Sequence, residues 1–190
     1  MTNNEIIALL ATRLSPKRLN HSIEVANEAK RLAKIYGQDE ERLYLAGLLH
    51  DITKETLPEE QLKYLNESDI ILTNIEKNAL KLWHAKSGAE FVKNRLGIKD
   101  EEIISAIRFH TTAKKGMTKF EKLLYIADFT SLDRDYPGVE DVRRAADKSI
   151  EDAMFEGLSF TICDLAKQGR PIHPDTFEAY NEITLKREVL

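Results

Sequence analysis

Apolar residues recur every three or four positions along most of the chain, which is the spacing of helices with one buried face. The clearest stretch begins at Ser15-Pro16, a capping residue followed by proline, and should end at Tyr36, just before Gly37. Its apolar positions are Leu19, Ile23, Ala26, Ala29, Leu32, Ala33 and Tyr36. Sustained alternation of apolar and polar residues is absent from the sequence, so strands should be minor or absent. The pattern predicts an all-α fold.

Capping residues and glycines divide the rest of the chain into further helices. We expect them over about 39–51, from Pro58 through Leu65, over 75–83, 85–96 and 100–110, and from Thr118 through Ala127. Residues 139–167 should form one long helix or two abutting ones, and a last helix should start at Asp175 or Thr176. The sequence has no evident linker or repeat. It therefore predicts a single helical domain over residues 1–190, with residues 1–14 as a peripheral N-terminal helix.

The composition narrows the class of protein. With 190 residues, 42% hydrophobic and 32% charged, the chain is typical of one soluble globular domain. Its net charge of −4 argues against a general nucleic-acid binder, and its apolar runs are shorter than the roughly 20 residues of a membrane span. Met1–Glu5 lack a signal-peptide pattern, and the single cysteine, Cys163, is expected to be a core thiol in a reducing compartment. We expect a cytoplasmic protein.

Histidines and aspartates stand at the ends of apolar helical runs. His50-Asp51 closes the run Leu43–Leu49, and Asp128 follows Leu123–Ala127. Burying a carboxylate is costly unless something positive meets it. Taken singly, each histidine could be a core or capping residue, but the set shares the donor types that divalent metals prefer. The sequence therefore predicts one or two metal ions held by His21, His50, Asp51, His84, His110 and Asp128.

These residues carry a family resemblance. His21, His50-Asp51 and Asp128, in this order, resemble the metal signature of the HD-domain superfamily of metal-dependent phosphohydrolases, and His84 with His110 resembles its two-metal branch. More narrowly, the chain resembles the YqeK family in the motifs Leu49–Lys54, Trp83–Ala85, His110–Thr112, Ala127–Phe129, Arg134–Val139, Pro171–Thr176 and Ala179–Asn181. Two departures are Ser131-Leu132-Asp133, where the family commonly has Glu-Pro-Asn, and Ala113, where it often has glycine.

The resemblance implies a symmetrical dinucleoside tetraphosphatase, an acid-anhydride hydrolase that splits diadenosine tetraphosphate into two ADP. It implies a di-iron centre, often in a homodimer, within a metal-binding helical core over residues 15–136, with residues 137–190 completing the nucleotide pocket. By resemblance, Asp51 bridges two metals, His21, His50 and Asp128 hold one, and His84 and His110 hold the other. Metal-activated water would attack phosphorus, with no protein nucleophile. Manganese, cobalt, nickel and zinc suit the same donors as iron.

Cations close to the ligands in sequence are candidates for phosphate binding, although each could equally be a solvated surface residue. His173, between two prolines, should either line the nucleotide pocket or cap the last helix, and Thr111 should either donate to phosphate or cap the preceding helix. The expected substrate-binding set is Arg18, His21, Lys54, Lys81, Thr111, Arg134, Arg170, Pro171, Ile172, His173, Pro174, Asp175 and Thr176.

Other functions remain open from the sequence. A nucleotidase or a cyclic-nucleotide phosphodiesterase would use the same ligand set, because it activates water and holds phosphate in each case. A metal-dependent nucleotide sensor, a partner-binding module or a helical core with structural metals are non-enzymatic alternatives. Six candidate ligands favour an open dinuclear site over a closed, four-coordinate structural one.

Overall fold

The computed structural model describes residues 1–187, and over this range it contains α-helices and one short 3-10 helix but no strand. This confirms the all-α prediction. The helices are α1 (Asn3–Arg13), α2 (Pro16–Tyr36), α3 (Glu40–Leu49), α4 (Pro58–Asn66), α5 (Asn74–Lys77), the 3-10 helix η1 (Leu80–Leu82), α6 (Trp83–Asn94), α7 (Glu101–Phe109), α8 (Lys119–Thr130), α9 (Val139–Ala146), α10 (Ile150–Lys167) and α11 (Pro174–Lys186).

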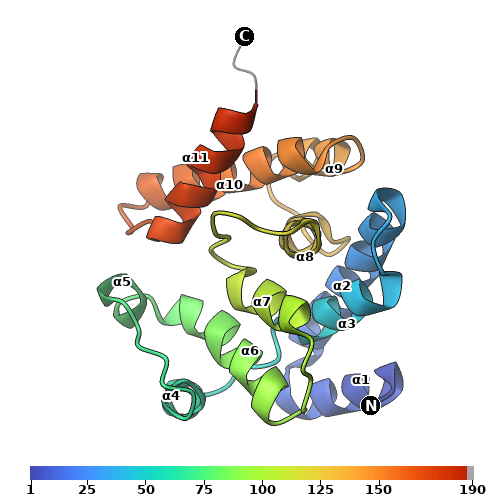
Figure 1. Ribbon diagram of the computed structural model, residues 1–190, viewed down its shortest axis with the longest axis vertical. Helices are drawn as coiled ribbons and strands as arrows, with labels where there is room; N and C mark the ends of the chain where they lie inside the picture. Colours follow the sequence, from blue (N-terminus) through green and yellow to red (C-terminus); the bar gives the residue numbers. More distant parts are fainter. Residues whose placement is uncertain (188–190) are drawn as a thin grey trace.

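The helices surround one main core. Figure 1 shows α7 between α6 and the pair α2 and α3, with α9, α10 and α11 across the end of the molecule where the chain finishes. Leu32, Leu43, Leu48, Ile107 and Leu124 are fully buried where α2, α3, α7 and α8 meet. α1 lies at the edge and buries Ile6 and Leu10 against this core. None of the helices described is both long and apolar enough to cross a membrane.

α2 and α3 pack with their backbones in contact, and a glycine makes this possible. A Cβ atom on Gly47 of α3 would lie only 2.5 Å from the Cα atom of Ala26 on α2. Two small residues at one crossing let the helices approach closely. The predicted ends of α2 are confirmed, with Ser15 as its N-cap and Gly37 (φ 64°) as its C-cap. The crossing brings the N-terminal half of α2 beside the C-terminal end of α3.

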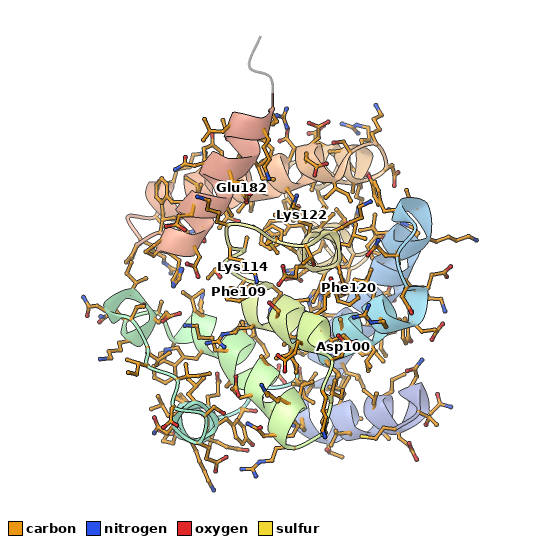
Figure 2. The ribbon with its side chains drawn as sticks, in the orientation of Figure 1. Asp100, Phe109, Lys114, Phe120, Lys122 and Glu182 are labelled. Carbon is orange, nitrogen blue, oxygen red and sulfur yellow. The ribbon has the colours of Figure 1, made fainter. Side chains whose placement is uncertain are left out.

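An arginine joins three helices through Asp100 and Phe120, both of which Figure 2 labels. Asp100 caps α7 by accepting from the backbone N–H groups of Glu102 and Ile103, and both its oxygens lie 2.8 Å from the guanidinium of Arg42 on α3. The same guanidinium lies over the ring of Phe120 on α8, 4.9 Å from its centroid. Fork pairing of this kind fixes orientation as well as adding energy. It ties α3, α7 and α8 together at the end away from the cap residues His50 and His110.

Some sequence predictions of helix bounds were wrong. A helix over 75–83 does not form: α5 is a single turn, and η1 follows it after an irregular Asn78-Ala79. The side chain of Trp83 donates through Nε1 to the backbone carbonyl of Glu76, 2.6 Å away, and this competes with continuation of the helix. Tertiary contacts override local propensity here.

Three further predictions are corrected. The helix expected over 39–51 ends at Leu49, so that His50 is its C-cap. The last helix begins at Pro174 rather than at Asp175 or Thr176, because His173 serves as its N-cap. Cys163 is exposed, so the expected core thiol is wrong. The apolar run around Cys163 lies on an outer turn of α10, which the pattern of apolar residues did not separate from the buried side. Residues 139–167 form two helices, α9 and α10, as one of the alternatives expected.

Candidate metal centre

All six predicted ligands lie close together, although they come from several helices and helix ends. His21 lies on α2, His84 on the first turn of α6 and Asp128 on α8, whereas His50 and His110 are the C-caps of α3 and α7, and Asp51 follows His50. His21, His50, Asp51, His84 and His110 are between 0% and 4% exposed, and Asp128 is half-buried. Burying these imidazoles and the Asp51 carboxylate away from water costs free energy unless other polar or charged groups pair with them.

The two cap histidines are held in one tautomer by their own helices. Nδ1 of His50 lies 2.7 Å from the Gly47 carbonyl oxygen, and Nδ1 of His110 lies 2.7 Å from that of Ile107. A carbonyl oxygen only accepts hydrogen bonds, so Nδ1 carries the proton in both rings. The Nε2 lone pairs are therefore left for the centre, which is the usual preparation of a metal-binding histidine.

The four imidazoles form a row. Ring centroids are 5.3 Å apart for His21 and His50, 5.0 Å for His50 and His110, and 5.0 Å for His110 and His84. His21 thus stands at one end of the row and His84 at the other.

Asp51 lies along this row with one oxygen toward each half. Its Oδ1 is 3.0 Å from Nε2 of His84 and 3.5 Å from Nε2 of His110. Its Oδ2 is 3.5 Å from Nε2 of His50 and 4.0 Å from Nε2 of His21. Asp128 contributes at the His21 end, where its Oδ1 is 3.0 Å from Nε2 of His21. This placement suits a carboxylate shared between two cations.

Buried atoms without partners support a metal fit. Nε2 of His50 and Oδ1 of Asp51 are both buried and make no hydrogen bond, since the contact from Oδ1 to His84 lacks hydrogen-bond geometry. Such orphaned groups are rare in folded proteins, and a metal ion bound between them would give both atoms a partner. Three sets of donors lie close enough to share an ion: His21, His50 and Asp51; His50, His110 and Asp128; and Asp51, His84 and His110. The residues fit divalent metal binding.

The protonation states match this fit. Burial alone would raise the pKa of Asp51, but His50, His110 and His84 hold it well below its usual range. Burial likewise acts to raise the pKa of Asp128, and Arg134 and His21 hold it well below that range. Burial lowers the pKa of His84 to about 4. At neutral pH the carboxylates are therefore ionised and His84 is neutral, the states in which they bind metals.

Three of the predicted cations reach the centre. Nη1 of Arg18 donates to Oδ2 of Asp51 at 2.9 Å. Arg134 donates to the carboxylate of Asp128 and, through Nε, to its backbone carbonyl at 2.6 Å. Nζ of Lys54 lies 3.0 Å from Nε2 of His84 and 3.7 Å from Oδ1 of Asp51. These side chains are only partly buried, so their charges also face the open side of the centre.

A cavity of about 580 Å³ opens beside the His84 end of the row. Its lining includes six residues of the predicted substrate set: Lys81, Thr111, Arg170, Pro171, His173 and Thr176. Ile172, Pro174 and Asp175 are not among the lining residues, although they belong to the same segment. His173 lines this cavity and also caps α11, because its Nδ1 accepts from the backbone N–H of Asp175 at 3.2 Å. We call this space the His84-end cavity.

Other contacts to the site were not expected from the sequence. Thr161 and Leu165 line the His84-end cavity but lie far from the ligand motifs in the chain, and Asn78 lines it six residues before His84. Oδ2 of Asp133 lies 2.7 Å from Nδ1 of His21, and Ser131 donates to its Oδ1 at 2.8 Å. Asp133 belongs to the segment that departs from the YqeK pattern. The sequence feature that could have identified Asp133 is that it is a further carboxylate, five residues after the predicted ligand Asp128.

Known proteins resemble this chain over nearly all its length. Residues 18–152 match the family model of the HD domain. The chain is 34% identical to the symmetrical bis(5'-nucleosyl)-tetraphosphatase of Bacillus subtilis, over 95% of this chain and 97% of that protein. It is 36% identical to the protein of the same name from Halalkalibacterium halodurans, over 99% and 100%. A crystal structure of a predicted HD superfamily hydrolase involved in NAD metabolism from Clostridium acetobutylicum superposes with a TM-score of 0.95 at 33% identity, covering 98% of this chain and 99% of that one.

Proposed function

The chain belongs to the HD-domain family and, within it, to the family of symmetrical bis(5'-nucleosyl)-tetraphosphatases, and from this membership we propose that it hydrolyses diadenosine tetraphosphate and water to two ADP. The observation in the structure that carries the proposal is the position of Asp51, whose two oxygens face His84 with His110 and His50 with His21. A carboxylate so placed could serve two ions, and enzymes that displace a group at phosphorus often use two.

We propose that His21, His50 and Asp128 hold one ion, His84 and His110 the other, and Asp51 both. Bound ions of this kind lower the pKa of a water molecule toward neutrality and offset charge on phosphate oxygens. The chain's own part is to fix the donors. Gly47 and Ile107 set the tautomers of His50 and His110, and Asp133 orients His21.

The cations around the centre are proposed to bind the polyphosphate. Arg18, Lys54 and Arg134 lie within hydrogen-bond or ion-pair distance of the ligands, so a phosphate chain over the row would meet all three. We propose that one nucleoside occupies the His84-end cavity, where Lys81, Thr111, Arg170 and His173 supply polar contacts.

The same cavity supports the proposed division of the chain. Thr161, Leu165 and the segment from Arg170 to Thr176 supply one wall, so residues 137–190 would complete the nucleotide pocket of a core over 15–136, with 1–14 at its edge. Residues 188–190 lie outside those described. Ile172, Pro174 and Asp175 are proposed to shape this wall.

Three finer points are proposed from the family resemblance. The two ions are iron, although the donors would also accept manganese, cobalt, nickel or zinc. The active form is a homodimer, and the enzyme works in the cytoplasm. Metal analysis of protein purified without added metal, sedimentation, and fractionation of the source cells test these points separately.

Product analysis tests the activity itself. Purified protein loaded with iron or manganese should convert diadenosine tetraphosphate to ADP alone, whereas ATP with AMP would contradict symmetrical cleavage. Cyclic nucleotides and nucleoside monophosphates, tested in parallel, separate this activity from a phosphodiesterase or nucleotidase. Binding of nucleotide without turnover of any of these compounds would instead favour a sensor.

Asp51→Ala provides the matching negative control. The variant should lose bound metal and turnover while its circular dichroism stays helical. Full turnover by Asp51→Ala would remove this residue from the proposed centre.

A further inference from the structure

A second cavity lies at the other end of the imidazole row, and it has about 340 Å³ of space. We propose that it binds the second nucleoside diphosphate half of the dinucleoside tetraphosphate, so that the substrate lies across the row; this rests on the proposed function. We call it the His21-end cavity. Beside His21, its lining includes Lys17, Arg18, Arg134, Asp135 and Tyr136.

The two cavities are placed for a substrate that is cut in the middle. The His84-end cavity is lined by Leu82, two residues before His84, and by Thr111, the residue after His110. The His21-end cavity contains His21 itself. The row between them joins His21 to His84 through His50 and His110. If the bond to be broken lies over the row, one half of the substrate extends toward each cavity. Symmetrical cleavage leaves one nucleoside diphosphate on each side of that bond, because both products are nucleoside diphosphates.

The charges of the His21-end cavity suit a phosphate chain that enters from the centre. Arg18 and Arg134 already touch the ligands Asp51 and Asp128, and both line this cavity. Lys17, the residue before Arg18, adds a third cation and makes no ion pair among the described residues. Two carboxylates oppose these cations, but Asp133 is engaged with His21 and Ser131. A phosphate chain would therefore meet cations first.

The outer part of the cavity suits a nucleoside. Asp135 is exposed there, and a carboxylate accepts hydrogen bonds from ribose hydroxyls or an exocyclic amino group. The ring of Tyr136 is fixed, because its hydroxyl donates to the Phe129 carbonyl at 3.1 Å and its ring centroid lies 4.8 Å from that of Phe160. A fixed aromatic ring offers contact area at little cost in conformational entropy.

The two cavities differ in a way that makes the proposal testable. The His21-end cavity is smaller, and Lys17 and Asp135 at its rim are exposed, so ADP alone should prefer the His84-end cavity. Only a ligand with two nucleosides must occupy both cavities. Loss of a contact at the His21 end should therefore weaken the double ligand selectively.

The experiment compares two ligands on the metal-loaded full chain. Calorimetry measures the Kd of ADP and of a diadenosine tetraphosphate whose central bridging oxygen is replaced by methylene, which resists symmetrical cleavage. Lys17→Ala combined with Asp135→Ala should raise the Kd of the double ligand about tenfold and leave that of ADP within about twofold. Lys34→Ala, an exposed change near the other end of α2, is the matched control and should alter neither.

The other outcomes of this binding experiment would overturn the proposal. If the double variant binds both ligands as the wild type does, or loses both equally, the His21-end cavity does not hold the second half. Failure of the proposed function looks different: the wild type would then leave unmodified diadenosine tetraphosphate uncleaved. Because the analogue reports binding without turnover, the two failures are read separately.

Discussion

The carboxylate of Asp133 lies 2.7 Å from Nδ1 of His21, while Nε2 of the same ring lies 3.0 Å from Asp128. An ionised carboxylate accepts a hydrogen bond, so Nδ1 is the protonated nitrogen and the Nε2 lone pair points inward. The carboxylate of Asp133 therefore fixes the tautomer of His21, as backbone carbonyls fix the tautomers of His50 and His110. Burial acts to raise the pKa of Asp133, but Ser131 and His21 lower it, so it stays ionised.

Removing this carboxylate should weaken metal binding. Partners of ligating histidines are typically worth about 10- to 100-fold in metal affinity, and Asp133→Ala should fall in that range. Asp133→Asn keeps an acceptor and should lose less. Chelator competition measures the affinity, and Asp141→Ala, an exposed aspartate on α9, is the control. Unchanged affinity in Asp133→Ala would leave the contact with no role in positioning His21.

Arg134 contacts Asp128 twice, so it could act on substrate or on a metal ligand. We expect Arg134→Ala to raise KM for diadenosine tetraphosphate by about tenfold or more, because a charge-assisted phosphate contact is lost. The metal content should be retained. Arg134→Lys should recover only part of KM, because an ammonium cannot reproduce the planar fork. A fall in metal content with KM unchanged would show that Arg134 positions Asp128 and does not bind the phosphate.

The sequence indicated the cluster of histidines and aspartates better than its surroundings, and the difference has a physical cause. His50 and Asp51 were recognisable because buried acids and imidazoles at the ends of apolar runs are costly without a shared partner. The sequence identified Asp133 only as part of a departure from the family pattern, because its contact with His21 spans 112 positions and leaves no periodic trace. Local pattern also favoured a helix through Asn78, where the contact of Trp83 with Glu76 favours a turn. The exposure of Cys163 depends on which side of α10 faces the bundle, and the mixed apolar and polar residues of Phe160–Leu165 do not specify that.

Gly47 should be intolerant of any side chain. In Gly47→Ala the new Cβ would lie 2.5 Å from Cα of Ala26 and 2.8 Å from its nitrogen, so α2 and α3 must separate. Overpacking of this kind costs about 1–3 kcal/mol or more of unfolding free energy. Urea denaturation measures it. Gly157→Ala on α10 is the matched control: its nearest neighbour is the Tyr125 side chain at 3.4 Å, so it should stabilise by about 0.5–1 kcal/mol. Equal effects of the two changes would contradict the close crossing.

The pair of Arg42 and Asp100 should make stability depend on acid pH. The hydrogen bonds from Arg42 hold the pKa of Asp100 below its usual value. A depressed pKa in the folded state means that the stabilisation is complete above the unfolded value of about 3.9 and is lost as pH falls through the lower, folded value. Asp100→Asn keeps a good cap for α7 but cannot ionise, so its stability should fall less steeply over this acid range.

A double-mutant cycle separates this pair from the other carboxylates of the chain. Unfolding free energies of the wild type, Asp100→Asn, Arg42→Met and the double variant are measured by urea denaturation at neutral pH and across the acid range below about pH 4. Arg42→Met should also flatten the acid dependence, because Asp100 then loses the cation that lowers its pKa. The coupling between the two changes should be present at neutral pH and shrink as Asp100 protonates. A coupling that is the same at both pH values would show that the pair acts independently of charge, with Arg42 held by its packing on Phe120 of α8.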